Sequence, residues 1–169
     1  YTARFDHFDL NEQGWRISAE ECAAAYDALA PELRDALNLA ADRIRAYHAA
    51  QLPENRDYRD AAGVRLGARW GGVDAAGVYV PGGRAAYPSS VLMNIIPAKV
   101  AGVARIVMVT PTPKGEVNAT VMAAAHIAGV DEIWRVGGAQ AIAALAYGTQ
   151  KIAPVDVVTG PGNAWVAEA

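Results

Sequence analysis

The sequence is poor in the residues that build disulfide frameworks and metal clusters. Its 169 residues include a single cysteine, Cys22, and only three histidines, His7, His48 and His126. One cysteine excludes an intramolecular disulfide and suits a reducing compartment, the cytoplasm. The histidines lie far apart in the chain and show none of the short paired spacings of zinc sites. We therefore expect histidines that pack or cap helices, and no metal site among them.

An excess of charge of one sign is also lacking, and so are long apolar runs. Fifteen Lys and Arg face eighteen Asp and Glu, a net charge of −3. This balance gives no footprint for nucleic acid or an anionic membrane. No apolar run approaches the roughly 20 residues of a membrane span. The first ten residues have no signal-peptide pattern and no initiator Met, so we expect the chain to begin inside a longer one.

Residues 1–75 are predicted to be mainly helical. Ser18 followed by Glu21 matches a capping box that opens a helix near residue 19. Cys22 lies in that alanine-rich helix, away from any glycine-rich turn, so we interpret it as a packed thiol rather than a nucleophile. Pro31 suits the first turn of a second helix, which Pro53 would end. Its apolar stripe is expected at Leu33, Leu37, Ala40, Ile44 and Tyr47.

Residues 61–74 are predicted to form short extended segments with glycine turns. Residues 76–169 have a different pattern of apolar and turn residues. Four short apolar runs each meet Gly or Pro and then a helical stretch: 77–80, 105–109, 132–134 and 155–158. Repeated βα units with apolar strands predict an α/β fold with a mostly parallel sheet covered by helices on both faces. Pro97 lies inside one helical stretch and should kink or break it. We thus expect a helical first part, 1–75, and a βα nucleotide-binding domain, 76–169.

Polar side chains adjoin the glycine-rich turns at the carboxyl ends of these strands. Three of the four turns are glycine-rich, at Gly82-Gly83, Gly137-Gly138 and Gly160-Pro161-Gly162. Ligands of open parallel sheets bind beyond this edge, where helix N-termini favour anions. The plain alternative is that the glycines only make tight turns. Because Tyr79, Gln140 and Asn163 adjoin these turns, we favour a nucleotide crevice, which Trp165 could border.

The standard nucleotide fingerprints do not match these turns. Trp165 stands where the third glycine of G-x-G-x-x-G belongs, and no P-loop motif occurs. The four tryptophans, Trp15, Trp70, Trp134 and Trp165, are most simply core or interface anchors. No acidic pair accompanies a histidine in a βα loop, so the sequence offers no general base.

Three long stretches carry a resemblance to a known family. They are GVYVPGGRAAYPSSVLMNIIPAKVAGV, VGGAQAIAALAYGT and VDVVTGPGNAWVAEA, in this order. Together they closely resemble histidinol dehydrogenase, and the weaker RFDHFDL and IRAYHAAQLP are similar to its N-terminal region. The resemblance implies an incomplete Rossmann-like architecture, like that of aldehyde dehydrogenases. It also implies a cytoplasmic, homodimeric zinc enzyme of histidine biosynthesis that oxidises L-histidinol to L-histidine through L-histidinal, using two NAD.

The resemblance also assigns roles to residues. The family's NAD contacts match Tyr79, Gln140 and Asn163, which are all intact. The family's zinc ligands and its Glu-His pair follow this point in the family order. We therefore expect a piece of a longer enzyme that carries the NAD-binding part, holds no zinc or catalytic residue, and is inactive alone.

Two alternatives remain open from the residues. An aldehyde-dehydrogenase-like oxidoreductase would need a catalytic cysteine in a loop, a place that Cys22 does not occupy. A non-catalytic nucleotide-binding or dimerisation module would need no further segment. The two differ from the zinc enzyme in whether simple aldehydes are turned over without zinc, and in whether the gene continues into His- and Glu-containing segments.

Overall fold

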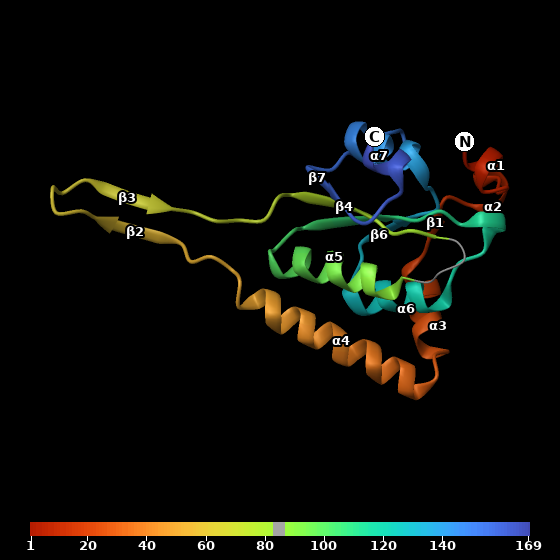
Figure 1. Ribbon diagram of the computed structural model, residues 1–169, viewed down its shortest axis with the longest axis horizontal. Helices are drawn as coiled ribbons and strands as arrows, with labels where there is room; N and C mark the ends of the chain where they lie inside the picture. The colour runs from red at the N-terminus through yellow and green to blue at the C-terminus, as the bar shows by residue number, and fades with distance from the viewer. Residues whose placement is uncertain (83–86) are drawn as a thin grey trace.

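The computed structural model describes residues 1–82 and 87–169, apart from the side chains at 12 and 13 (Figure 1). The elements before the central sheet are α1 Thr2–Phe5, α2 Leu10–Gln13, β1 Arg16–Ile17, α3 Ala19–Asp27, α4 Pro31–Ala49, β2 Arg56–Arg59 and β3 Arg65–Ala68. Those that follow are β4 Ala75–Tyr79, α5 Pro88–Val100, β5 Arg105–Val109, the 3-10 turn η1 Pro113–Gly115, α6 Ala119–Ala128, β6 Glu132–Trp134, α7 Gly138–Tyr147, β7 Val157–Thr159 and α8 Ala164–Ala167.

The central sheet has the strand order β1-β6-β5-β4-β7. Strands β4, β5, β6 and β7 pair in parallel, as their apolar runs predict. Strand β1 was not expected. It pairs antiparallel with β6 at one edge, with Ile17 opposite Ile133, and so fixes the N-terminal segment to the sheet.

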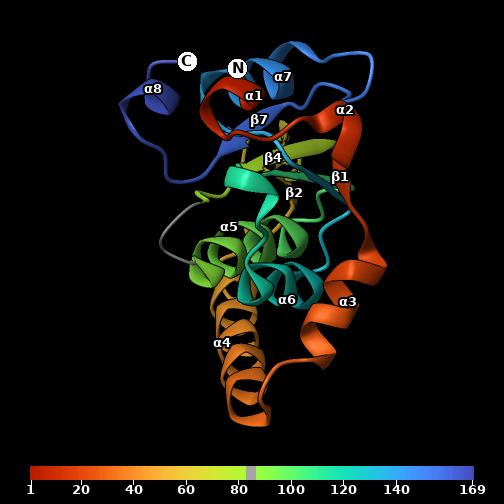
Figure 2. The ribbon, with the colours of Figure 1, turned by 90° about the vertical axis from the view of Figure 1, so that its right-hand side faces the viewer.

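Helices cover both faces of this sheet, which confirms the predicted α/β class (Figure 2). On one face, side chains such as Val78 and Ile106 pack with α3, α4, α5 and α6. On the other, Val107 and Val109 pack with α7 and α8. All five residues of β4 are buried, which explains why its sequence shows no polar alternation.

The two helices expected in the first part are both present. Ser18 and Glu21 form the reciprocal capping box of α3, and Pro31 is the first residue of α4. The apolar stripe of α4 is right only in its middle: Leu37 is buried, and Ala40 and Ile44 pack against the core. Leu33 and Tyr47, at its ends, are exposed because the helix runs past the body that it covers. The division near residue 75 stays a prediction.

Of the kink or break expected at Pro97, the break was wrong, and the kink stays a prediction. Helix α5 continues through Pro97 to Val100. Pro97 lies within the last turn of α5, so the hydrogen bond that its missing N–H cannot make is lost close to the end of the helix. The neighbouring Ile95 and Ile96 are buried in the core, and this packing favours the continuous helix.

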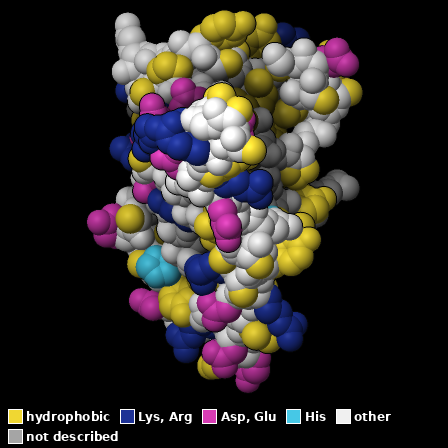
Figure 3. All heavy atoms as spheres, turned by 90° about the vertical axis from the view of Figure 1, so that its left-hand side faces the viewer, with side chains coloured by type: hydrophobic (Ala, Val, Ile, Leu, Met, Phe, Trp, Pro, Cys, Tyr) yellow, Lys and Arg dark blue, Asp and Glu magenta, His cyan; other side chains and the backbone are white. Residues whose placement is uncertain are grey.

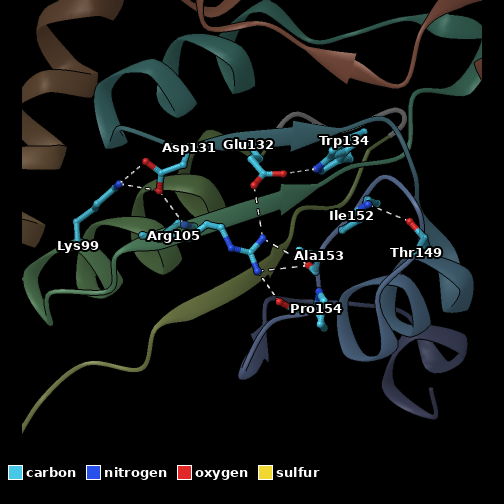
Figure 4. A network of polar contacts seen from close by, with 10 residues as sticks. Lys99, Arg105, Asp131, Glu132, Trp134, Thr149, Ile152, Ala153 and Pro154 are labelled. Carbon is cyan, nitrogen blue, oxygen red and sulfur yellow. Dashed lines mark hydrogen bonds and ion pairs between the residues drawn. The ribbon is translucent and has the colours of Figure 1, made fainter.

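The amino-terminal end of the sheet is held by charged side chains (Figure 4). Asp131 accepts hydrogen bonds from Lys99 Nζ at 2.9 Å and from the backbone N–H of Ile106 at 2.7 Å. Arg105 lies 3.5 Å from the Glu132 carboxylate and donates to the carbonyl oxygen of Pro154. These contacts join β5, β6 and the loop before β7. Ion pairs therefore link the strands at the end of the sheet opposite the glycine-rich turns.

Candidate nucleotide-binding edge

The glycine turns at the carboxyl ends of the strands pack against one another. A Cβ on Gly82 would overlap the carbonyl oxygen of Pro111, and one on Gly137 would overlap the Pro111 ring. Gly160 has φ +129° and lies against the backbone carbonyl of Tyr79. Contact between turns is therefore sufficient to require these three glycines. Gly83 lies outside the described residues.

Tyr79 ends β4 in the centre of this edge. Its ring is buried, with 5% of the residue exposed, and its hydroxyl accepts a hydrogen bond from the backbone N–H of Gly138 at 3.2 Å. Burial raises the pKa of the phenol, with the Gly138 bond opposing this and the charge of Asp6 adding to it. The hydroxyl thus stays protonated, and it is only the acceptor in the hydrogen bond from Gly138. It can donate that proton to a neighbouring acceptor.

Gln140 lies in the first turn of α7, two residues after Gly138, whose N–H donates to the Tyr79 hydroxyl. The side chain folds back over Gly138, because its Oε1 lies 2.8 Å from where a Cβ of that glycine would be. Gly138 has φ +68°, a conformation that suits glycine. The residue is half-buried. Tyr79 and Gln140 are therefore brought together around Gly138.

Asn163 follows the β7 turn and caps the short helix α8. Its Oδ1 accepts from the backbone N–H of Val166 at 3.2 Å, and this leaves the amide Nδ2 to donate elsewhere. Asn163 is exposed, and Trp165 beside it is 77% exposed. Asn163 is joined to Tyr79 through the turn, because Gly160 packs on the Tyr79 carbonyl. Trp165 and Trp70 are not core residues, whereas Trp134 is buried.

Two hollows of the described residues lie near the sheet, and the three candidate residues line neither of these two. One of about 450 Å³ lies at the ends of β4 and β5, against Gly82, Thr112, Lys114 and Asn118. The other, of about 520 Å³, lies between α3 and α6.

Of the remaining candidate groups, Cys22 is buried, His48 is half-buried, and His7 and His126 are exposed. Cys22 is 3% exposed, and burial raises the pKa of its thiol to about 11, which confirms a packed rather than a nucleophilic cysteine. The His126 ring lies against Tyr26, with centroids 5.1 Å apart, and His48 meets the edge of Tyr47. Within residues 1–82 and 87–169, no three His, Cys, Asp or Glu side chains are grouped so that they could hold a metal ion.

Arg135, a structural residue near this edge, was not anticipated from the sequence. Its guanidinium lies 4.2 Å from the centroid of the buried Phe8 ring and donates to the Gly115 carbonyl at 2.8 Å. Its backbone N–H donates to Trp15, and that of Lys114 donates to Asp6. These contacts join residues 6–15 to the turns after β5 and β6. Burial lowers the pKa of Arg135. No short motif signals such a contact, because it joins three distant segments.

Comparisons with known proteins agree with this architecture. The family model described as "Histidinol dehydrogenase" matches residues 1–169. The chain is 67% identical over 168 residues to histidinol dehydrogenase of Zymomonas mobilis, and 62% identical over 169 residues to that of Rhodospirillum rubrum. These alignments cover 99% and 100% of this chain and 39% of each relative.

A solved structure gives the same result. The crystal structure of histidinol dehydrogenase from Elizabethkingia anophelis superposes with a TM-score of 0.92 at 35% identity, over 99% of this chain and 39% of that one. The chain therefore spans about two fifths of the length of the relatives that it matches. Sequence, family model and fold agree over the whole described length, and the chain belongs to the histidinol dehydrogenase family.

Proposed function

We propose that this chain is the NAD-binding part of an enzyme that oxidises L-histidinol to L-histidine by way of L-histidinal. Membership in the family supports the substrate, the reaction in histidine biosynthesis and a cytoplasmic homodimer. The observation that carries the cofactor proposal is the meeting of Tyr79, Gly138 and Gly160 at one sheet edge, with Gln140 and Asn163 beside them.

Each of the three side chains has a group to offer a nucleotide. Tyr79 has a hydroxyl proton, Gln140 has a half-buried amide beside a helix N-terminus, and Asn163 has the Nδ2 that its capping bond leaves over. Amides and a phenol recognise ribose hydroxyls and phosphate oxygens as neutral donors. NAD, when bound, supplies the acceptor for the hydride that leaves the substrate carbon.

Zinc does not fit the described residues, because no group of three candidate ligands occurs among them. We place the zinc ligands and the proton-transferring residues in the part of the relatives that this chain does not span. Residues 1–169 alone should therefore form no NADH with histidinol. Histidinol-dependent NADH from a mass-verified sample of these residues would overturn this assignment.

The cofactor proposal is tested by NAD titration calorimetry on the protein as encoded in its gene. Gln140→Ala should weaken NAD binding by about tenfold, the value of one or two polar contacts. Asn163→Asp keeps the capping oxygen of α8 but removes the Nδ2 donor, and it should weaken binding by a similar factor. Gln150→Ala, an exposed glutamine just beyond the other end of α7, is the matched control and should bind NAD as the wild type does. Unchanged affinity in both site variants would contradict the proposal.

A further inference from the structure

Asp6 carries a carboxylate that the proposed function does not use. The residue lies between α1 and α2 and is half-buried. Among the described side chains, the other half-buried carboxylate is that of Glu132, which accepts hydrogen bonds from Arg105 and from the indole N–H of Trp134. No described residue donates a hydrogen bond to the Asp6 carboxylate. Burial raises its pKa, and the charge of His7 opposes this shift. A carboxylate that is partly withdrawn from water and has no donor is a candidate site for a ligand that supplies donors.

Contacts of the N-terminal segment hold Asp6 at the carboxyl end of the sheet. Its carbonyl oxygen accepts a hydrogen bond, at 2.6 Å, from the backbone N–H of Lys114 in the turn η1 that follows β5. Two residues further on, Phe8 is buried against the guanidinium of Arg135, which follows β6. Figure 1 shows α1 and α2, the helices on either side of Asp6, at this end of the sheet. The segment is therefore fixed to the turns after two neighbouring strands.

The same turns connect Asp6 with Tyr79. Pro111, which follows β5, packs against Gly137. The next residue, Gly138, donates its N–H to the Tyr79 hydroxyl at 3.2 Å. Burial raises the pKa of Tyr79, the bond from Gly138 opposes this, and the negative charge of Asp6 adds to it. The Asp6 carboxylate thus lies near the phenol, at the part of the edge where the cofactor is proposed to bind.

The place of Asp6 corresponds to that of an acidic residue in ordinary dinucleotide-binding folds. In those folds a carboxylate near the end of the second parallel strand accepts a hydrogen bond from the ribose 2′-hydroxyl of NAD. The second parallel strand of this chain is β5, and residues 110–115, which follow it, read TPTPKG and include no carboxylate. Asp6 reaches the turn after this strand from the N-terminal segment instead, through its bond with Lys114.

Carboxylates at the opposite end of the molecule are placed differently. There β2 and β3 form a two-stranded antiparallel ribbon that extends from the body (Figure 1). Figure 3, viewed from the side of this ribbon, shows basic and acidic side chains next to one another. Asp57 pairs with Arg65 on the ribbon, and Asp131 pairs with Lys99 at the amino-terminal end of the sheet. These two carboxylates have cationic partners within the chain, whereas that of Asp6 has no donor among the described residues.

We infer that Asp6 determines the cofactor specificity of this edge: its carboxylate accepts a hydrogen bond from the ribose 2′-hydroxyl in the adenosine half of NAD and excludes NADP. The inference rests on the proposed function, because it assigns one contact within the proposed nucleotide edge. The ribose hydroxyl supplies the donor that Asp6 lacks within the chain, and a charged acceptor makes such a bond stronger than a neutral one. The 2′-phosphate of NADP would replace this donor by a second anion, which the carboxylate repels.

The decisive experiment compares NAD with its 2′-deoxyadenosine analogue, which lacks the ribose 2′-hydroxyl. Both are titrated by calorimetry into the protein as encoded in its gene. The wild type should bind the analogue about tenfold more weakly than NAD, as expected for the loss of one hydrogen bond to a charged acceptor. Asp6→Asn keeps the size of the side chain but removes its charge, so most of this difference should disappear. Equal affinity of the wild type for both compounds would overturn the inference, and so would an equal difference in both proteins.

A second measurement uses NADP. Asp6→Asn should lower the ratio of NAD affinity to NADP affinity by at least about tenfold. Asp9→Asn is the matched control, because it removes the same charge three residues away, keeps the oxygen that caps α2 and should leave the ratio unchanged. Glu116→Gln tests the exposed carboxylate that follows η1, and a fall of the ratio in this variant instead of in Asp6→Asn would contradict the assignment. NAD binding with an unchanged ratio in Asp6→Asn would refute the role of Asp6 alone, whereas a wild type that binds no NAD would refute the proposed function as well.

Discussion

The central sheet and the ribbon are two β-structures of one chain with opposite surroundings. Strand β4 is buried at all five positions, and β2 is exposed at all four. The buried strand is a continuous apolar run, whereas the exposed strand has three charged residues and one tyrosine. The comparison teaches that burial on both faces selects apolar residues at every position, whereas a strand exposed on both faces can carry charged residues at successive positions.

The two structures should also differ in how much they stabilise the fold. Val78 and Ile106 of the sheet are fully enclosed, whereas the ribbon has no contact with the core. Segments with few buried contacts open at low free-energy cost, and core strands open only with global unfolding. The chain therefore combines a stable sheet with an exposed ribbon that opens at low cost. Three matched pairs of substitutions can break or sharpen this contrast.

The largest difference is expected between two glycines with positive φ. Gly160→Ala places a Cβ against the Tyr79 carbonyl at φ +129°, whereas Gly63→Ala, at φ +83° in the ribbon turn, meets nothing within 4 Å. The first should cost about 4 kcal/mol or more in the free energy of unfolding, and the second about 1 kcal/mol of backbone strain. Urea unfolding measures both. Equal costs would show that conformation, and not contact between turns, selects Gly160.

A smaller difference is expected between two aliphatic side chains. Ile106→Ala removes a side chain that is 0% exposed in β5, and it should cost about 3 kcal/mol. Leu66→Ala, at 41% exposure, should change the unfolding free energy of the monomer by at most about 0.5 kcal/mol. Circular dichroism during urea unfolding measures both free energies. A Leu66→Ala cost near that of Ile106→Ala would place the ribbon in the monomer core.

The smallest effect is an alkaline loss of stability from Cys22. Its pKa is raised from 9.0 to about 11 in the folded chain, so the unfolded thiol ionises first. The contribution is fully present below pH 9 and is lost as pH rises towards 11, at up to about 1.4 kcal/mol per pH unit. Cys22→Ala should flatten this part of the curve of unfolding free energy against pH. Asp57→Asn, in the ribbon, should leave it as it is, since that carboxyl titrates in the acid range. A Cys22→Ala curve as steep as that of the wild type would contradict the assignment.

Much of the fold could be predicted from local signals. The capping box at Ser18 and Glu21 and the proline that opens α4 depend on residues a few positions apart. The four parallel strands follow from short apolar runs that end in Gly or Pro. The same signals placed Tyr79 and Gln140 at one edge, and the structure brings both to Gly138. Local chemistry is sufficient where one segment determines its own conformation.

The remaining features depend on distant partners. Strand β1 has two residues and forms only because β6 offers an edge. The stacking of Arg135 on Phe8 joins segments over a hundred residues apart, and no spacing rule anticipates it. The continuity of α5 through Pro97 depends on the core that surrounds it. The requirement for glycine at position 160 could not be predicted without the neighbouring strand, because the backbone of Tyr79 in β4 excludes a side chain there.

The strand order has a consequence for where a ligand can enter. Along the chain, β4, β5 and β6 are laid down in one direction across the sheet, and the chain then returns so that β7 lies on the other side of β4. Helices α5 and α6 pack on one face and α7 on the other. Helix α8, which follows β7, packs on the same face as α7 through Val166, so the connections from β4 and β7 leave this edge towards opposite faces, the arrangement of a topological switch point. Tyr79 ends β4, and Asn163 lies in the turn after β7. The path of the backbone alone therefore places these two residues on neighbouring strands whose connections diverge.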